Sequence, residues 1–256
     1  MKVRSNLDFG VIYHKNSHKK VYKTLSILIF MKLIVSGGGS GDDSKEQDAL
    51  FASMLDKSKP LLYIPIAMDT TDHSYPDCLM WLKSTFEKLG VIDYEMFDLK
   101  SLEKPINIDP NNYSGIYIGG GNTPFLLKKL KESGFWNFLK KAIEKDIPIM
   151  GGSAGALILA KSIVPCLNHD LNWVELKDFS GMNCINEWEI SCHYINKEKE
   201  EIIKMIKDNS IKKLIALSEK NGLYVSDEGI KLIGQESAVI FNNGDVRELG
   251  VGEFIN

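Results

Sequence analysis

The sequence predicts a three-layer α/β fold, in which a mostly parallel sheet carries helices on both faces. Three observations lead to this prediction. From Met31 onwards, short apolar runs alternate with amphipathic stretches that are long enough to be helices. Hydrophobic residues make up 44% and charged residues 25% of the 256 residues, as in globular proteins with a large core. Near the C-terminus, short apolar runs are separated only by turns, which indicates added antiparallel strands.

Five apolar runs are expected to form the parallel strands. They contain few polar residues, which is typical of strands that are buried on both faces. Each spans roughly four to six residues, too few for an ordinary helix. The runs are 32–36, 61–66, 94–99, 115–118 and 147–150.

The stretches between these strands are expected to be helices, because their apolar residues fall on one face at helical spacing. Pro76 and the pair Thr123-Pro124 are typical of helix starts, where proline needs no N–H partner and threonine caps the first turn. Gly90 is typical of a helix end, and Gly134 divides one long stretch in two. The expected helices are 43–55, 76–89, 124–133, a second piece that ends near 145, and 154–163.

The C-terminal quarter is expected to add antiparallel strands that pack on the same core. The turn Asn242-Asn243-Gly244 is typical of a hairpin. No repeat, low-complexity tract or linker interrupts the chain, so residues 31–256 are predicted to form a single domain. The expected strands are 214–217, 222–225, 230–233 and 238–241.

Residues 1–30 differ from the rest of the chain in charge. They hold six of the 31 basic residues and one of the 34 acidic residues, which leaves the remainder with a net charge of −8. The apolar run 25–31 is too short to span a bilayer and is not followed by a small-residue cleavage site. We therefore expect an N-terminal extension outside the core rather than a signal peptide.

Charge and cysteine content exclude several classes of protein. A net charge of −3 provides no overall basic field that would attract nucleic acid, and no apolar run is long enough to span a membrane. We therefore expect neither nucleic acid nor a membrane as a partner. The four cysteines, at 78, 166, 184 and 192, form no CxxC pair, which argues against a zinc site or a disulfide framework and favours a cytoplasmic protein. No metal or cofactor is expected, and the oligomeric state stays open.

Three glycine clusters follow predicted strands, where ligands of open α/β sheets bind. The cluster 37–39 matches neither a dinucleotide fingerprint nor a phosphate loop, because Asp42 stands where glycine or alanine is needed. We interpret it as a tight turn. The cluster 151–155 matches the nucleophile elbow G-x-S-x-G between a strand and a helix, with Ser153 as the nucleophile. A plain helix entry capped by Ser153 is the alternative.

The remaining cluster, 119–121, ends a neighbouring strand. The backbone N–H groups of Gly121 and Ala154 are therefore expected to form an oxyanion hole beside Ser153. Asn122 is a candidate for substrate binding. The alternative is a purely structural role, in which Asn122 and Thr123 cap the next helix.

His193 is the expected base, because it follows an apparent strand, 188–192, and a strand end holds a side chain rigidly. His169 is the other histidine after the elbow. Asp170 is the expected acid that orients His193. Three rival carboxylates stay open: Glu175, Glu187 and Glu189.

The sequence Gly119-Gly120-Gly121-Asn122-Thr123, followed about thirty residues later by Gly-x-Ser-Ala-Gly-Ala, resembles the dipeptidase E (aspartyl dipeptidase) and cyanophycinase family of serine peptidases. The resemblance runs from Met31 to about His193. It implies a fold related to class I glutamine amidotransferases, Ser153 as nucleophile, the histidine of His193-Tyr194 as base, and an acid between them in sequence, which Asp170 fits best.

The chain departs from the family pattern around His193. Cys192 stands where family dipeptidases usually have proline, and no Gly-Glu-Thr-Arg-like stretch follows the histidine. Lys197 is the candidate cation for an acidic substrate. We expect a serine exopeptidase for short peptides, with a weaker preference for N-terminal Asp than is usual in the family. An esterase or acyl-transferase with the same triad, and a non-catalytic binding protein of the same fold, are the alternatives.

Overall fold

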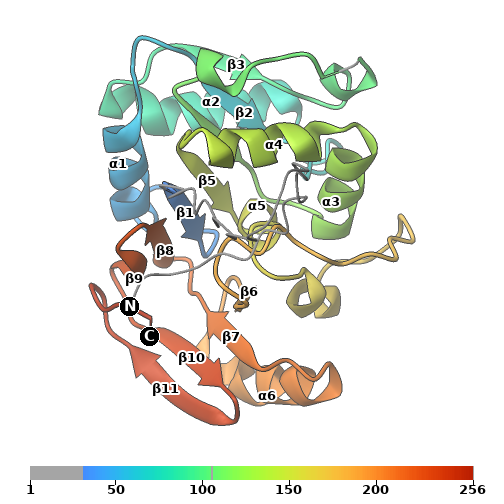
Figure 1. The fold of residues 1–256 in the computed structure, drawn as a ribbon, viewed down its shortest axis with the longest axis vertical. Coiled ribbons are helices and arrows are strands. Elements are labelled where there is room, and N and C mark those ends of the chain that lie inside the picture. Colours follow the sequence, from blue (N-terminus) through green and yellow to red (C-terminus); the bar gives the residue numbers. More distant parts are fainter. Residues whose placement is uncertain (1–30, 105, 256) are drawn as a thin grey trace, which may run out of the picture.

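The computed structural model describes residues 31–104 and 106–255 (Figure 1). The expectation of an N-terminal extension concerns residues 1–30 and lies outside the described residues. Two sheets organise the described chain, one of seven strands and one of four. No helix within the described ranges is both long enough and apolar enough to cross a membrane.

The seven-stranded sheet confirms the predicted parallel core. In spatial order its strands are β3 (Tyr94–Met96), β2 (Leu61–Ile64), β4 (Gly115–Ile118), β5 (Ile149–Gly152), β1 (Leu33–Ser36), β8 (Asn221–Ser226) and β9 (Gly229–Gly234). The first five pair in parallel, and β8 and β9 continue the sheet in antiparallel order. The carboxyl ends of β4, β5 and β1 therefore meet at one edge, as expected for the glycine clusters.

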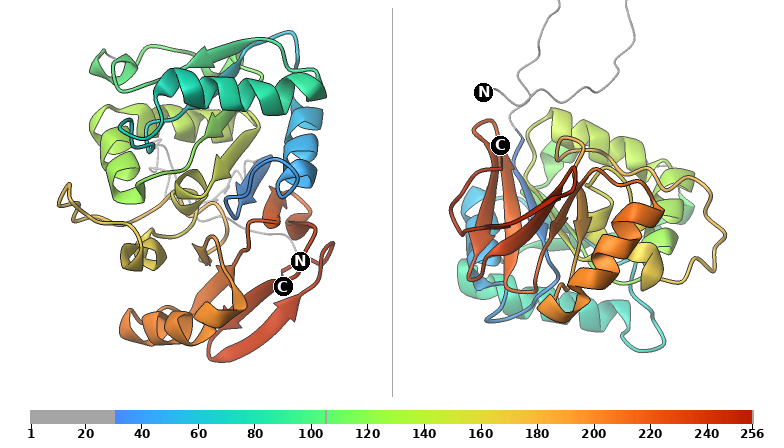
Figure 2. Two further views of the ribbon diagram at one scale, coloured as in Figure 1. Left: turned by 180° about the vertical axis from the view of Figure 1, so that it is seen from behind. Right: turned by 90° about the horizontal axis from the view of Figure 1, so that it is seen from below.

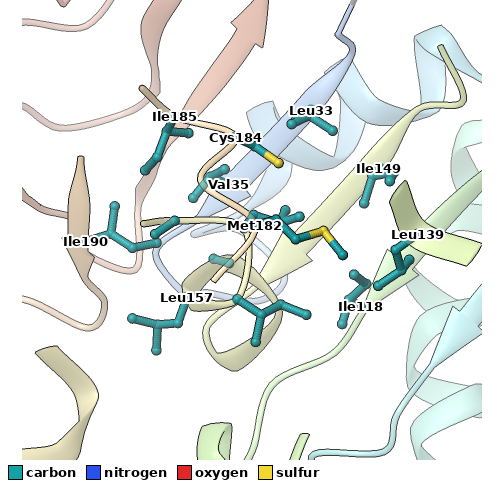
Figure 3. Packing of buried hydrophobic residues seen from close by; sticks show 14 of the residues in the cluster. Leu33, Val35, Ile118, Leu139, Ile149, Leu157, Met182, Cys184, Ile185 and Ile190 are labelled. Atoms are coloured by element: carbon teal, nitrogen blue, oxygen red, sulfur yellow. The ribbon is translucent and has the colours of Figure 1, made fainter. Parts of the chain in front are cut away.

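Helices cover both faces of this sheet, because alternate side chains along each strand point to opposite sides. Leu33 and Val35 lie in one hydrophobic cluster with three helices, whereas Ile34 lies in a second cluster with two others. The first face carries α3 (Thr123–Glu132), α4 (Phe135–Glu144) and α5 (Ala154–Leu157), and the second carries α1 (Lys45–Met54) and α2 (Tyr75–Phe86). Figure 3 shows the first cluster, in which side chains of β1, β4 and β5 meet Leu157 and Met182.

Most helix boundaries follow the predicted signals. Ser74 caps α2 just before its first-turn proline, and Gly134 separates α3 from α4 with a φ of 78°. The helix predicted over 154–163 is shorter than expected and ends at Leu157. Beyond it the chain turns away, and the N–H groups of Lys161 and Ile163 donate to backbone carbonyls of the loop that returns to β6. Short 3-10 helices lie at Glu87–Leu89, Ser101–Glu103, Pro110–Asn112, Val164–Asn168 and Asn196–Glu198.

The second sheet has the order β11 (Asp245–Leu249), β10 (Ala238–Asn242), β7 (Lys213–Ala216) and β6 (Glu189–Ser191). Most C-terminal strands are antiparallel as predicted, but β6 and β7 run parallel to each other. Helix α6 (Lys199–Asp208) connects them and packs Ile202 and Met205 against Leu214. Views from the front and from behind place β7, β10, β11 and α6 at the end of the molecule opposite α2 and β3 (Figures 1 and 2).

Candidate active site

Ser153 lies at the sharp turn between β5 and α5, as the elbow motif predicts. Its backbone has φ 50° and ψ −110°, a left-handed conformation that is unusual for a residue with a side chain. The flanking glycines are required sterically. A Cβ at Gly151 would lie 2.3 Å from the carbonyl oxygen of Gly155, and one at Gly155 would lie 2.2 Å from that of Ile118. The motif therefore forms a strained strand-to-helix turn that presents the serine hydroxyl.

His193 follows β6 and reaches Ser153 from the neighbouring sheet. Its Nε2 lies 2.8 Å from Ser153 Oγ, within hydrogen-bond distance. Its backbone N–H donates to the carbonyl oxygen of Gly37 over 3.0 Å, and its φ is 56°. The structure thus brings together the two residues that the sequence predicted as nucleophile and base.

The carboxylate that contacts His193 is Glu219, which the sequence analysis did not select. Glu219 Oε1 lies 2.8 Å from His193 Nδ1. Glu219 lies between β7 and β8, three residues beyond the end of β7. Because β6 and β7 are parallel, their carboxyl ends are adjacent, and the residues that follow them meet. Ser153, His193 and Glu219 therefore form a continuous chain of hydrogen-bonded side chains.

The structure places Asp170 away from His193, which corrects the expectation that this carboxylate orients the ring. Asp170 Oδ2 instead accepts hydrogen bonds from the backbone N–H and the hydroxyl of Thr123, over 2.9 and 2.5 Å. It therefore ties the loop after Val164–Asn168 to the first turn of α3. Sequence order misled the prediction, because an acid between nucleophile and base in sequence need not lie between them in space.

None of the three rival carboxylates contacts His193 among the described residues. Glu189 accepts from the N–H and hydroxyl of Ser162, and Glu187 pairs with Lys161 at 3.0 Å. Glu175 is exposed in the loop that leads to β6. Each is thus occupied or placed elsewhere, and Glu219 is the carboxylate in position to orient the ring.

A cavity of about 230 Å³ opens beside Ser153 and His193. Its walls combine apolar side chains and thiols with two carboxylates and a second histidine. The lining residues are Ser153, Leu157, Pro165, Cys166, His169, Asp170, Ser191, Cys192, His193 and Glu198. Its volume lies below the range of about 300–1,000 Å³ that is typical of drug-sized ligands. A small substrate fits such a space.

The two cysteines in this cavity are not competing nucleophiles. Burial, and secondly the charge of Asp170, raise the pKa of the Cys192 thiol to about 12. The same two causes raise the pKa of the Cys166 thiol well above its ordinary value. Both thiols therefore stay protonated near neutral pH, whereas the reactive form of cysteine is the thiolate. Ser153, whose Oγ lies 2.8 Å from His193 Nε2, is the candidate nucleophile of this cavity.

The glycine run 119–121 lies directly beside the elbow. A Cβ at Gly120 would lie 3.2 Å from Ser153 Cβ. Gly121 has a φ of 129°, and a Cβ there would lie 2.0 Å from the carbonyl oxygen of Ala67. The closeness of this run to Ser153 is compatible with the predicted oxyanion hole of the Gly121 and Ala154 N–H groups, which stays a prediction.

The two candidate substrate-binding residues lie outside the cavity lining. Asn122 caps α3, since its Oδ1 accepts from the N–H of Phe125, and its Nδ2 donates to the carbonyl oxygen of Leu171. The side-chain atoms of Asn122 are therefore engaged in structural contacts, as the alternative interpretation held. Lys197 is exposed in the short 3-10 helix before α6. Asn122 and Lys197 therefore do not line the cavity, and the charge of Lys197 lies outside it.

Comparison with known proteins identifies the family to which the chain belongs. The profile of peptidase family S51 matches residues 32–233. Peptidase E of Nostoc sp. strain PCC 7120 is 24% identical over 199 residues, which cover 74% of this chain and 78% of the relative. Peptidase E of Streptomyces coelicolor is 28% identical over 148 residues, 54% of this chain and 59% of the relative.

Solved structures show the same fold at lower identity. The crystal structure of a peptidase from an acI-B1 actinobacterium superposes with a TM-score of 0.62 and 21% identity, covering 88% of this chain and 96% of the other. This likeness confirms the predicted α/β fold. Together with the family match over most of the chain, it confirms the resemblance that the motifs carried. The chain belongs to peptidase family S51 and is a serine-type peptidase of the dipeptidase E family.

Proposed function

We propose that this peptidase is an exopeptidase for short peptides that acts through Ser153, His193 and Glu219. The observation that carries the proposal is the pair of 2.8 Å contacts that link the hydroxyl, the imidazole and the carboxylate. A carboxylate at Nδ1 fixes the tautomer in which Nε2 is free to accept the serine proton. The small volume of the cavity beside the hydroxyl favours a substrate of few residues over an extended chain.

The proposed reaction has two halves. Ser153 Oγ attacks the scissile carbonyl carbon while its proton passes to His193 Nε2, and the Gly121 and Ala154 amides stabilise the oxyanion. The C–N bond then breaks as His193 returns the proton to the leaving amine, which leaves an acyl-enzyme. Water then attacks the ester carbonyl carbon while one of its protons passes to His193. The bond between the acyl carbon and Ser153 Oγ breaks, His193 returns the proton to Oγ, and the carboxylic acid product leaves. Glu219 stabilises the imidazolium in both halves and stays ionised.

The charge of the cavity argues against the expected preference for N-terminal Asp. Asp170 and Glu198 line the cavity, and no lysine or arginine lines it among the residues that the structure describes. An aspartyl side chain would be held there without the cationic partner that a carboxylate needs when it is partly desolvated. The free α-ammonium group of a peptide, in contrast, matches these acids. We therefore propose that the enzyme recognises the N-terminal amine more than an acidic first side chain.

A dipeptide panel tests this proposal. Initial rates with Asp-Leu, Asn-Leu, Glu-Leu and Ala-Leu give kcat/KM for each first residue, and N-acetyl-Ala-Leu tests the need for a free amine. We expect Ala-Leu to equal or exceed Asp-Leu and the acetylated peptide to be a poor substrate. A clear preference for Asp-Leu would overturn the charge argument, and equal cleavage of the acetylated peptide would overturn the exopeptidase assignment. Hydrolysis of p-nitrophenyl acetate without any peptide hydrolysis would instead favour the esterase alternative.

A further inference from the structure

We propose that the glycine run Gly37–Gly39, which follows β1, is a positioning element for the catalytic base and acid. The run has no role in the reaction described above, and the sequence identified it only as a tight turn. The inference rests on the proposed roles of His193 and Glu219. Its evidence is steric: the backbone of these glycines occupies the space between the two residues and the core sheet.

Gly38 lies against the imidazole ring. It has a φ of 110°, and a Cβ there would lie 2.3 Å from His193 Cε1 and 2.6 Å from Nε2. Real Cβ atoms do not approach other atoms this closely, so a side chain at Gly38 would displace the ring. The preceding residue, Gly37, accepts a hydrogen bond from the backbone N–H of His193. The run thus fixes the base both at its backbone and at its ring.

The same run packs against the segment that carries Glu219. A Cβ at Gly39 would lie 2.1 Å from the carbonyl oxygen of Glu219, and a Cβ at Gly37 would lie 1.9 Å from that of Ser218. The N–H of Gly37 donates to the carbonyl oxygen of Asn221 over 3.0 Å. Three consecutive glycines therefore connect the base and the acid, which are 26 residues apart in sequence, to the end of β1.

Such support matters because burial does not hold the pair. The side chains of His193 and Glu219 are 47% and 53% exposed. Exposed side chains change rotamer readily, and a misplacement of about 1 Å in a catalytic group can reduce turnover about 10²-fold. A rigid backbone against one face of the ring restricts it to the orientation that meets Ser153. Only glycine leaves room for that contact.

The test compares Gly38→Ala with Gly41→Ala. Gly41 lies in the same loop with a φ of 61°, and a Cβ there would meet nothing within 4 Å. The control also places alanine at a positive φ but makes no contact with His193. A φ of 61° strains alanine less than the 110° of Gly38, so the double-mutant stability cycle is needed to separate strain from contact. We expect Gly38→Ala to lower kcat, and the rate at which a fluorophosphonate labels Ser153, by about 10²-fold at unchanged KM. Gly41→Ala should stay within about threefold of the wild type in all three measurements.

A stability cycle tests the contact independently of activity. In urea denaturation, Gly38→Ala should lower the unfolding midpoint more in the wild type than in the His193→Ala background, where the obstructing ring is absent. If Gly38→Ala alone fails to fold, His193→Ala should restore folding. An equal midpoint shift in both backgrounds, or turnover of Gly38→Ala equal to that of Gly41→Ala, would overturn the proposal. Absence of peptide hydrolysis by the wild type would instead refute the proposed function and leave the cycle interpretable.

Discussion

Replacement of Glu219 by glutamine separates the acid found in the structure from the one that the sequence favoured. The amide keeps the shape of the side chain but removes its charge. It can also donate a hydrogen bond to His193 Nδ1, which would place the ring proton on Nε2. In that tautomer the ring cannot accept the proton of Ser153. Both effects should slow acylation while the fold is retained.

The expected magnitude follows from the geometry of the pair. Two unit charges about 4 Å apart interact by about 1 kcal/mol in water and about 4 kcal/mol in the environment of a protein surface. Because the side chains of His193 and Glu219 are both about half exposed, the lost stabilisation of the imidazolium should lie between these two energies. The effect of the wrong tautomer adds to it. A factor of ten in rate corresponds to about 1.4 kcal/mol. We therefore expect kcat/KM to fall about 10²–10³-fold, less than the roughly 10⁴-fold seen for a buried triad acid.

The assay measures kcat/KM on Ala-Leu and the rate at which a fluorophosphonate labels Ser153, for Glu219→Gln and for Asp170→Asn. Asp170→Asn also neutralises a carboxylate near the site, but that carboxylate contacts Thr123 rather than His193. Because Asp170 is also proposed to bind the substrate amine, the labelling rate, which needs no amine, is the deciding measurement. Asp170→Asn should change it by less than about tenfold and should lower the melting temperature, because a contact with α3 is weakened. The reasoning is refuted if Asp170→Asn slows labelling as much as Glu219→Gln or more.

Four further outcomes are expected. Ser153→Ala should abolish fluorophosphonate labelling and reduce turnover by up to about 10⁶-fold while the circular dichroism spectrum is retained. His193→Ala should be nearly as damaging, whereas His169→Ala, which alters the cavity wall only, should cost less than about tenfold; reversed effects in the same assay would assign the base to His169. Burial raises the pKa of Asp48 from 3.8 to about 6, so the folded state binds the extra proton and the free energy of unfolding should fall by about 2 kcal/mol as pH rises from 4 to 6. Urea titrations should show a flatter pH dependence for Asp48→Asn. A chain that begins at Met31 should fold and turn over Ala-Leu normally, and loss of solubility or activity would show that residues 1–30 contribute to the domain.

The sequence predicted the nucleophile and the base because each depends on local pattern. A G-x-S-x-G turn needs small residues at fixed spacing, and the steric contacts of Gly151 and Gly155 explain that requirement. His193 stands at the end of a short apolar strand, which is also a local feature. Both residues could therefore be placed at strand ends before any tertiary contact was known.

The acid could not be found in this way, because its position depends on how two distant strands pair. The antiparallel expectation covered the strands from 214 onwards and included no pairing with the strand 188–192, so nothing in the sequence placed the residues that follow β6 beside those that follow β7. In the structure these strands are parallel, and the N–H of Leu217 donates to the carbonyl oxygen of Ser191 at their shared end. A carboxylate directly after a second strand was the available signal for Glu219. Without the pairing, nothing distinguished it from other exposed glutamates.

The glycine run after β1 illustrates the same limit. Its composition was visible in the sequence, and the absence of a phosphate-loop pattern led to its interpretation as a tight turn. The reason for the glycines is tertiary, since the atoms that exclude a side chain belong to His193, Ser218 and Glu219. Local sequence shows that a side chain is missing, but not what takes its place.

Mass spectrometry of the labelled protein shows whether Ser153 is the catalytic nucleophile. The wild-type chain is incubated with a fluorophosphonate, its intact mass is measured, and its proteolytic peptides are sequenced. We expect one adduct per chain, on Ser153, whose formation is proportional to the loss of Ala-Leu hydrolysis. An adduct on another residue, or complete loss of hydrolysis while Ser153 stays unmodified, would contradict this expectation.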